Sequence, residues 1–323
     1  MCFMQRYAIE QKTEKGVDFH VLTCSESNRR IEACISLSNG ANLCRLSSGG
    51  LPVIDFDAKE LLCGQYTGTP VMYPTPNRVE NGAFIWQGKS FIQRKRGTPV
   101  LIHGLVHDEP FTLLDARADE NGAVLLARIE FTERDFFDCF PYKHSLDVGF
   151  RLVENALKIS YDIHNRSPEP LPYGFGLHPY FQKLSGDATL IEVPVGGVMD
   201  MTDELLPTGA IHDVEGTIFD LRTPVSINDI DFDHVFLRED AGSIAYITYP
   251  EQKLRVSIGA TDDFSHYVVY SPKGKHFFCI ESQTCSTNAH NLYAKGFRQE
   301  SGLKLAEAMT RTRGEATYRI EQL

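Results

Sequence analysis

The amino-acid sequence predicts an all-β fold, a large antiparallel β-sandwich. Three observations lead to this class: short stretches that alternate apolar and polar residues, turn-forming residues that separate them at roughly 8 to 12 residue spacing, and few helical patterns. In such a sandwich each sheet buries one face against the other. No internal repeat, low-complexity segment or linker-like change in composition divides the 323 residues, so we expect a single domain over residues 1–323.

The clearest alternation lies in residues 144–167, HSLDVGFRLVENALKISYDIHNRS. Every second residue from Leu146 to Leu152 is apolar, and the same pattern runs from Leu157 to Ile163. This predicts two half-buried strands joined in a hairpin at residues 153–156. Similar stretches predict strands at 20–26, 32–38, 124–132, 243–249, 253–260, 266–272 and 276–282. Helical patterns are limited to residues 291–297 and 302–309.

Composition narrows the classes of partner. The 32 Lys and Arg residues stand against 43 Asp and Glu, a net charge of -11, so the chain should repel polyanions and we expect no nucleic-acid partner. No run approaches the roughly 18 to 20 apolar residues that cross a bilayer, so we expect no membrane partner. The eight cysteines form no Cys-x-x-Cys pair and no apolar leader is present, which predicts a reduced, cytoplasmic protein. A monomer and a homodimer are both compatible with the sequence.

Polar residues that strand patterning does not require are concentrated in five segments: residues 73–84, 102–111, 173–181, 229–237 and 279–292. Singly, most have a structural explanation. Asn77 and Arg78 suit a turn with a surface ion pair, and His103 and His178 have apolar neighbours, as core histidines do. Glu281 differs, because it directly follows an apolar strand and an unpaired buried carboxylate is costly.

Metal and nucleotide binding find little support. His103 and His107 are four residues apart, but Gly104 and nearby prolines oppose the helix that a zinc motif with this spacing needs. The cysteines and histidine between residues 279 and 290 match no standard zinc spacing. The sequence also lacks GxGxxG, GxxxxGK[ST] and GxSxG patterns. We therefore expect no metal and no cofactor.

Taken in chain order, the polar segments resemble the aldose 1-epimerase (galactose mutarotase) family. That family's pattern is Pro-x-x-Asn-Arg followed by Gly-x-Phe, then His-Gly, His-x-Tyr-Phe, an Asp near an aromatic, and a Glu on a late strand. The matching elements here are Pro74 to Arg78 with Gly82 and Phe84, His103 with Gly104, His178 to Phe181, Asp233 to Phe236, and Glu281. The resemblance covers nearly the whole chain, and its weight comes from the shared order of the five elements.

The resemblance implies a galactose mutarotase-like supersandwich that binds a monosaccharide in an open cleft, and an isomerase that needs no metal or cofactor. It implies Glu281 as the general base and His178 as the general acid. The substrate-binding residues that it implies are Asn77, Arg78, His103 and Asp233.

The reaction suits these residue types. Interconverting the α and β anomers of a free hexose requires removal of the proton from the C1 hydroxyl and protonation of the ring oxygen, followed by the reverse after C1 rotates. A carboxylate and an imidazolium on opposite sides of the C1–O5 bond supply this pair, and each ends the cycle in its starting state. Arg and His donors stabilise the charge that develops on the ring oxygen.

Several positions stay open at this stage. Thr75 stands where many family members carry a tryptophan, which suggests a smaller or more polar wall of the sugar site. Asp231 competes with Asp233, and His107 suits either the site or a surface turn. The cluster of residues 94–96 (Arg-Lys-Arg) suits either a phosphate site or the solvated edge of a hairpin. One or two neighbouring aromatic residues are expected to contact the sugar, from Tyr73, Phe84, Trp86, Tyr173, Phe175, Tyr180 and Phe181.

Two alternative functions stay open as well. The first keeps the fold and mechanism and changes the substrate to a phosphorylated or otherwise modified sugar. The second is a non-catalytic carbohydrate-binding protein on the same fold, although a pure binder has no need of an acid and a base together.

Overall fold

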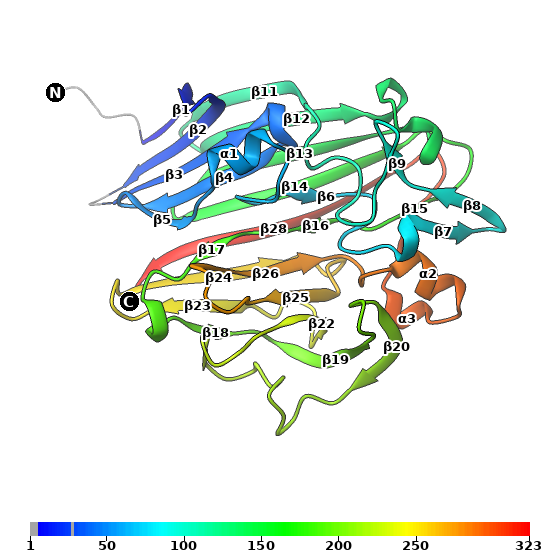
Figure 1. Ribbon diagram of the computed structural model, residues 1–323. Helices are drawn as coiled ribbons and strands as arrows, with labels where there is room; N and C mark the ends of the chain where they lie inside the picture. Colours follow the sequence, from blue (N-terminus) through cyan, green and yellow to red (C-terminus); the bar gives the residue numbers. More distant parts are fainter. Residues whose placement is uncertain (1–5, 27–28) are drawn as a thin grey trace.

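The predicted all-β class is confirmed by the computed structural model, which describes residues 6–26 and 29–323 (Figure 1). Within these residues two large antiparallel sheets account for most of the strands. The first has thirteen strands, and β16 (Gly176–Leu177) and β6 (Val71–Met72) pair beside its main path. In hydrogen-bonded order the main path is β1 (Tyr7–Glu14), β2 (Val17–Glu26), β3 (Arg29–Ser36), β4 (Asn42–Ser48), β5 (Leu51–Ile54), β17 (Phe181–Gln182), β26 (Phe277–Gln283), β25 (His266–Tyr270), β22 (Asp233–Arg238), β19 (Val195–Met201) and β20 (Pro207–His212).

The second large sheet has nine strands within the same described residues. In order they are β11 (Thr112–Asp119), β12 (Gly122–Glu130), β13 (His144–Val153), β14 (Ala156–Asn165), β28 (Arg311–Gln322), β24 (Leu254–Ala260), β23 (Ala245–Tyr249), β18 (Leu190–Glu192) and β21 (Val225–Ser226). Buried side chains of both large sheets belong to one apolar cluster, which includes Leu46 and Ile54 from the first and Phe150 and Ile159 from the second. The two sheets therefore share a core, as expected for a sandwich.

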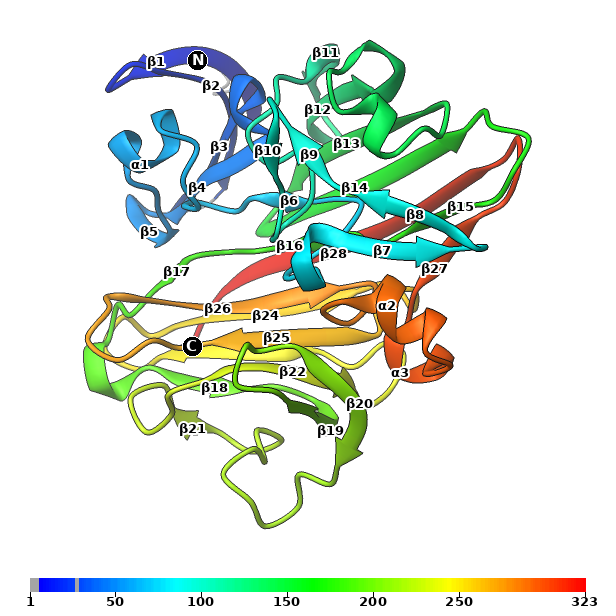
Figure 2. The same ribbon diagram turned by 45° about the vertical axis from the view of Figure 1, so that its right-hand side comes forward.

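Short elements complete the fold. The two-stranded sheets are β7 (Ala83–Trp86) with β8 (Lys89–Ile92), β9 (Arg94–Lys95) with β10 (Thr98–Pro99), and β15 (Leu171–Tyr173) with β27 (Lys304–Ala306). The helices are α1 (Ala58–Leu62), α2 (Ala289–Ala294) and α3 (Arg298–Ser301). Figures 1 and 2 show β7, β8, α2 and α3 together at the right-hand end of the molecule. No helix in the part of the chain that the structure describes is long and apolar enough to cross a membrane.

The predicted hairpin is present as β13 and β14, and the turn between them contains Glu154 and Asn155. Its register pairs Leu146 with Ile163 and Leu152 with Leu157, so the two apolar stripes face the core together. The other predicted strands correspond to β2, β3, β12, β23, β24, β25 and β26.

The helix predictions near the C-terminus are only partly right. The helix expected at residues 291–297 begins and ends earlier, as α2. The helix expected at 302–309 is wrong, because this segment contains β27, which pairs with β15 through Leu171 and Ala306. A left-handed glycine, Gly302 (φ 60°), ends α3 directly before it, and a residue of this kind commonly stops a helix.

Candidate active site

Glu281 lies within β26, in the interior of the first large sheet. Alternation along the strand sends Phe278 and Ile280 into the core and turns Glu281 to the other face, which Cys279 and Gln283 share. The Glu281 residue is only 1% exposed. The apolar run before it therefore forms the buried strand that the sequence predicted, and this strand carries the carboxylate into the interior of the protein.

His178 lies opposite Glu281 because of strand register. β16 and β17 flank His178, and both pair with β26, through Gly176 to Gln283 and through Phe181 to Phe278. These two pairings share one antiparallel register, in which His178 falls level with Glu281. The His178 Nε2 atom lies 3.3 Å from the Glu281 Oε1 atom. The register thus brings together two groups that are about a hundred residues apart in the sequence.

Gly176 packs closely against side chains of both neighbouring strands. A Cβ atom at this position would lie 2.7 Å from the Met72 side chain and 3.0 Å from that of Gln283. A larger residue here would therefore require the flexible side chains of Met72 and Gln283 to shift.

Asn77 and Arg78 are held by a left-handed turn. Asn77 has φ 56°, a conformation that asparagine tolerates better than most residues, and its Oδ1 accepts from the Arg78 backbone N (2.8 Å) and Nη1 (3.2 Å). The Arg78 Nη2 atom lies 3.0 Å from Asp233 Oδ2. The side chains of this ion pair are 28% and 25% exposed, so both remain accessible to a ligand.

His103 reaches the same place through the backbone of Asn77, whose carbonyl accepts from the His103 N–H (2.9 Å). Gly104 follows with φ 73°, and a Cβ atom there would lie 2.3 Å from the carbonyl oxygen of Tyr73. The His-Gly element is therefore needed because only glycine permits this approach to Tyr73.

A small pocket of about 180 Å³ brings all six sequence-predicted site residues together. The residues that line it are Tyr66, Asn77, Arg78, Ile102, His103, His178, Tyr180, Asp233, Tyr270 and Glu281. Of the seven aromatic residues named from the sequence, Tyr180 lines this pocket, and aromatic contact with a sugar stays a prediction. Tyr66 and Tyr270 were missed, although an aromatic residue in the polar 63–70 loop was a signal for the first.

Aromatic contacts fix the histidine rings. The His178 ring stacks on Tyr180 at 4.7 Å and meets His103 edge-on at 5.0 Å. The His103 ring in turn meets Tyr66 edge-on at 4.5 Å. A continuous row of rings thus borders the pocket, and it presents both polar edges and flat faces to a ligand.

Burial shifts the pKa values of both members of the central pair. It raises the pKa of Glu281 well above its ordinary value of 4.5, and the hydrogen bond from Gln283 Nε2 (2.8 Å) opposes this rise. It lowers the pKa of His178 from 6.5 to about 3. At pH values between the lowered pKa of His178 and the raised pKa of Glu281, the pair holds a single proton. One of its members can then donate a proton while the other accepts one.

His103 is neutral for the same reason, because burial and the neighbouring His178 lower its pKa well below 6.5. Its Nδ1 atom has no hydrogen-bond partner among residues 6–26 and 29–323. A buried polar atom without a partner is costly, and a ligand hydroxyl in the pocket can supply that partner. No group of three or more His, Cys, Asp or Glu side chains in the described parts of the chain is arranged to hold a metal ion.

Comparison with known proteins agrees with this geometry. A family described as aldose 1-epimerase matches residues 34–308. The chain belongs to the aldose 1-epimerase family. YihR, an uncharacterized protein of Escherichia coli strain K12, is 25% identical over 78% of this chain and 80% of its own length. Galactose mutarotase of Sus scrofa is 27% identical over 47% of this chain and 44% of that enzyme, so less than half of the mutarotase is aligned.

Solved structures share the fold of this aldose 1-epimerase family member over nearly its whole length. A galactose mutarotase-like protein of Clostridium acetobutylicum superposes with a TM-score of 0.82 at 19% identity, over 98% of this chain and 99% of the other. Galactose 1-epimerase of Lactobacillus acidophilus NCFM gives a TM-score of 0.77 at 14% identity, again over 98% and 99%. At these identities the likeness is one of fold, and the predicted mutarotase-like supersandwich is confirmed.

Three of the positions whose role the sequence left undecided lie outside the pocket lining. Asp231 forms a surface ion pair with Lys273 (3.4 Å), whereas Asp233 lines the pocket. Thr75 is buried, donates to Gln93 Oε1 (3.0 Å) and is not among the residues that line the pocket. His107 packs against Tyr66 with 4.9 Å between ring centres. In this aldose 1-epimerase family member, His107 therefore supports a pocket residue from behind.

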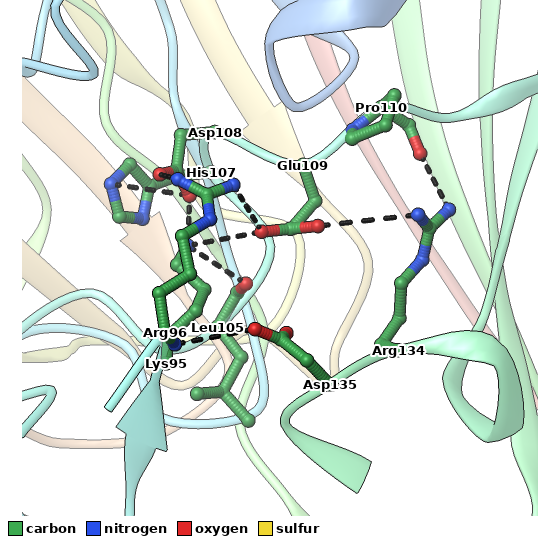
Figure 3. A network of polar contacts seen from close by, with 9 residues as sticks. All are labelled: Lys95, Arg96, Leu105, His107, Asp108, Glu109, Pro110, Arg134 and Asp135. Carbon is green, nitrogen blue, oxygen red and sulfur yellow. Dashed lines mark hydrogen bonds and ion pairs between the residues drawn. The ribbon is translucent and has the colours of Figure 1, made fainter. Parts of the chain in front are cut away.

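Two members of the basic cluster at 94–96, Lys95 and Arg96, are paired with nearby acids, as Figure 3 shows. Lys95 Nζ bonds to Asp108 and to the Leu105 carbonyl (3.2 Å), and Arg96 Nη2 lies 2.9 Å from Glu109. The hairpin is present as β9 and β10, and the expected solvated edge is confirmed at the exposed Arg94 and Arg96 but not at Lys95, which is only 9% exposed. These contacts fix the position of the segment that follows His103. A phosphate that bound to Lys95 and Arg96 would have to displace the carboxylates of Asp108 and Glu109.

Lys95→Met is expected to lower the free energy of unfolding by about 2 to 3 kcal/mol, because it leaves the largely buried Asp108 and Glu109 carboxylates without their ammonium partner. Chemical denaturation of the two proteins measures the difference. Arg94→Met is the matched control, since Arg94 precedes Lys95 in the same strand and is exposed. Equal denaturation midpoints for Lys95→Met and Arg94→Met would contradict the role of Lys95 in holding this segment in place.

Proposed function

We propose that this chain is an aldose 1-epimerase that interconverts the α and β anomers of a free hexose. The observation that carries the proposal is the buried Glu281 and His178 pair, 3.3 Å apart in a pocket that also contains the Arg78 and Asp233 ion pair. Membership of the aldose 1-epimerase family supports the reaction class. The mutarotases among the matched proteins support a sugar substrate, although the alignment covers less than half of each.

The position of the pair suits the two oxygens of an anomeric carbon. The hydroxyl oxygen O1 and the ring oxygen O5 are both bonded to C1, so a base and an acid that act on them must also lie side by side. Glu281 and His178 do so. Their placement on opposite sides of the C1–O5 bond stays a prediction for the sugar complex.

In the proposed cycle Glu281 takes the proton of the C1 hydroxyl while His178 gives its proton to O5. The C1–O5 bond breaks, C1 and O1 become the carbonyl of the open aldehyde, and C1 rotates about its bond to C2. O5 then attacks the other face of C1, returns its proton to His178, and O1 recovers the proton held by Glu281. Protons balance over the cycle, and positioned groups of this kind contribute roughly 10² to 10⁴-fold each.

The remaining residues have positioning roles in this proposal. Arg78 and the His103 ring face the pocket and donate hydrogen bonds to sugar oxygens, and Asp233 accepts from sugar hydroxyls. Asn77 acts through Arg78, whose side chain it holds. Tyr66, Tyr180 and Tyr270 offer ring surfaces for the apolar C–H face of a pyranose.

The test is polarimetry of freshly dissolved α-glucose and α-galactose with the purified protein. Equilibration much faster than in buffer supports the proposal. Equilibration at the buffer rate for a panel of free aldoses overturns it, and calorimetric sugar binding in that case would identify a carbohydrate-binding protein. Acceleration with phosphorylated sugars alone would move the substrate to that class.

Gln283→Leu is expected to change the pH profile. Loss of the Gln283 hydrogen bond raises the pKa of Glu281 further, so the carboxyl keeps its proton to higher pH. The basic limb of the pH profile of kcat/KM therefore moves to higher pH. In the pH range where the pair holds one proton, a smaller fraction of the enzyme has Glu281 ionised. The plateau of kcat/KM therefore falls roughly tenfold or more.

The matched control for this profile is Ser282→Ala, a truncation on the opposite face of β26. This variant should leave the acidic and basic limbs of the pH profile of kcat/KM unchanged. A Gln283→Leu profile that is lower but unshifted would mean that Gln283 serves the fold and not the pKa of Glu281.

A further inference from the structure

Asn42 is a buried polar residue close to the candidate active site but outside its lining. It is the first residue of β4 and is only 1% exposed. Its Oδ1 atom accepts from the Thr69 N–H (2.8 Å), and its Nδ2 atom donates to the Thr67 carbonyl (2.9 Å). The amide therefore joins the backbone on both sides of Gly68. These buried bonds fix the course of the loop, because a backbone group left unpaired in the interior is costly.

Gly68 lets this loop lie directly against β4. It has φ 71°, and a Cβ atom there would lie 2.5 Å from Asn42 Oδ1 and 2.9 Å from the Cys44 Cα atom. A glycine avoids both the strain of the left-handed conformation and the contact with the β4 backbone. The loop of residues 66–70, which lies between α1 and β6, is thus held at the start of β4.

The 66–70 loop in turn holds the segment that carries His178. The Pro70 carbonyl accepts from the His178 N–H (3.1 Å), and the Gly68 carbonyl accepts from the Tyr180 N–H (2.8 Å). The His178 ring stacks on the Tyr180 ring. Because the same segment pairs with β26 on its other side, the loop and β26 together set the position of the His178 backbone.

The same loop also places an aromatic side chain in the pocket. Tyr66 lines the pocket and meets the His103 ring edge-on. Its other neighbour is the His107 ring, and a Cβ atom at Gly40 would lie 2.1 Å from the His107 carbonyl oxygen. The corner of residues 40–42 therefore contacts both segments that determine where Tyr66 lies.

We propose that Asn42 is a positioning residue for the anomerisation, because it holds the loop that sets His178 and Tyr66 at the pocket. The assignment rests on the proposed function for the reaction that these residues serve. Asn42 contacts neither His178 nor Tyr66 through the hydrogen bonds of its side chain. It acts through the backbone of Thr67 and Thr69.

The experiment compares Asn42→Ala with Asn165→Ala. Asn165 is a matched control, because it is fully buried and joins a loop by the same kind of bonds: it accepts from the Ser167 N–H (2.9 Å) and donates to the Glu169 carbonyl (2.9 Å). It does not line the pocket. Both variants lose stability, so an effect on the reaction that only Asn42→Ala shows is separate from a general loss of folding.

The kinetic expectation is a loss in kcat that exceeds the change in KM. A small displacement of the proton donor misaligns the transfer, so Asn42→Ala should lower kcat for α-glucose or α-galactose roughly 10 to 100-fold per folded molecule. Asn165→Ala should retain most of the native kcat. Gly68→Ala displaces the same loop from the other side and should reproduce the loss. Asn42→Asp keeps the acceptor for Thr69 and should retain more activity than Asn42→Ala, and it replaces that variant if the alanine does not fold.

The pH profile of kcat/KM should become narrower in Asn42→Ala. Burial lowers the pKa of His178 to about 3 and raises that of Glu281. A displaced loop admits water, so the pKa of His178 rises toward 6.5 and that of Glu281 falls toward 4.5. The acidic limb then moves to higher pH and the basic limb to lower pH. The variants leave unchanged the titratable and charged groups that face His178, which are Glu281, His103, Arg78, Tyr180 and Tyr270.

Amide hydrogen exchange tests the same link without any substrate. The His178 and Tyr180 amides donate to the 66–70 loop, so in Asn42→Ala they should exchange roughly tenfold or more faster than in Asn165→Ala, both measured relative to the native protein. The amides of β13, in the other large sheet, report on global unfolding and correct for the difference in stability.

The outcomes separate the two proposals. If the native protein accelerates no free aldose, the proposed function fails, and hydrogen exchange still decides whether Asn42 holds the His178 segment. If the native protein is active but Asn42→Ala keeps its kcat and an unshifted pH profile, the role of Asn42 is overturned while the function stands. Equal losses in Asn42→Ala and Asn165→Ala would likewise overturn it.

Discussion

Glu281→Gln is expected to lower kcat for anomerisation by roughly 10² to 10⁴-fold while the fold persists, because the amide keeps the shape of the carboxyl and cannot accept a proton. Polarimetry or NMR exchange measures the rate, and circular dichroism checks the fold. Glu251→Gln is the matched control, since Glu251 is an exposed glutamate in the turn between β23 and β24. Full activity of Glu281→Gln would mean that the base is another residue.

The same substitution is expected to stabilise the protein as pH rises. Burial raises the pKa of Glu281 in the folded state, so between its ordinary value of 4.5 and the folded value the native protein binds more protons than the unfolded chain. Stability therefore falls with increasing pH in this window. The amide has no proton to lose, and the Tm advantage of the variant should grow with pH. A difference in Tm that does not depend on pH would contradict the raised pKa.

His178→Asn is expected to lower kcat by roughly 10² to 10³-fold, because O5 then receives no proton from the protein as the ring opens. The reverse step suffers equally, so both anomers should react slowly. His276→Asn, at an exposed histidine outside the pocket, is the control and should retain full rate.

The double variant provides a further check on the pair. Glu281 and His178 share one proton, so removal of either should disable most of the exchange, and the double variant should be little worse than Glu281→Gln alone. Strictly multiplicative losses would show that the two groups act independently, which the 3.3 Å contact argues against.

Much of the fold was predictable because strand patterning is local. The period-two alternation of residues 146–152 and 157–163 identified both strands of the hairpin and the face that each buries. The same logic failed at residues 302–309, where leucines and alanines have a helical spacing and yet Ala306 belongs to a strand that pairs with β15. A partner strand more than a hundred residues away overrode the local preference there.

Some residues of the candidate site were likewise predictable from the sequence, and others were not. The sequence pointed to Asn77, Arg78, His103, His178 and Glu281 by their order along the chain, and the structure places all of them in one pocket with Asp233. Tyr270 could not be found by pattern, because nothing local distinguishes it from core aromatics, whereas the polar loop around Tyr66 was the one local signal for that residue. Lys95 was similarly hidden, since its burial depends on Asp108 and Glu109 across the loop.

By itself, the sequence determined the β class through short-range periodicity. It also determined the family resemblance through residue types in a shared order, and that resemblance implies the acid and base candidates. Only the tertiary structure decided that Glu281 and His178 lie side by side and that Asp233 and not Asp231 faces the pocket. The physical reason is strand register. A shift of one residue between β26 and its neighbours would turn a different set of side chains toward the pocket, and that register is fixed by packing between distant segments.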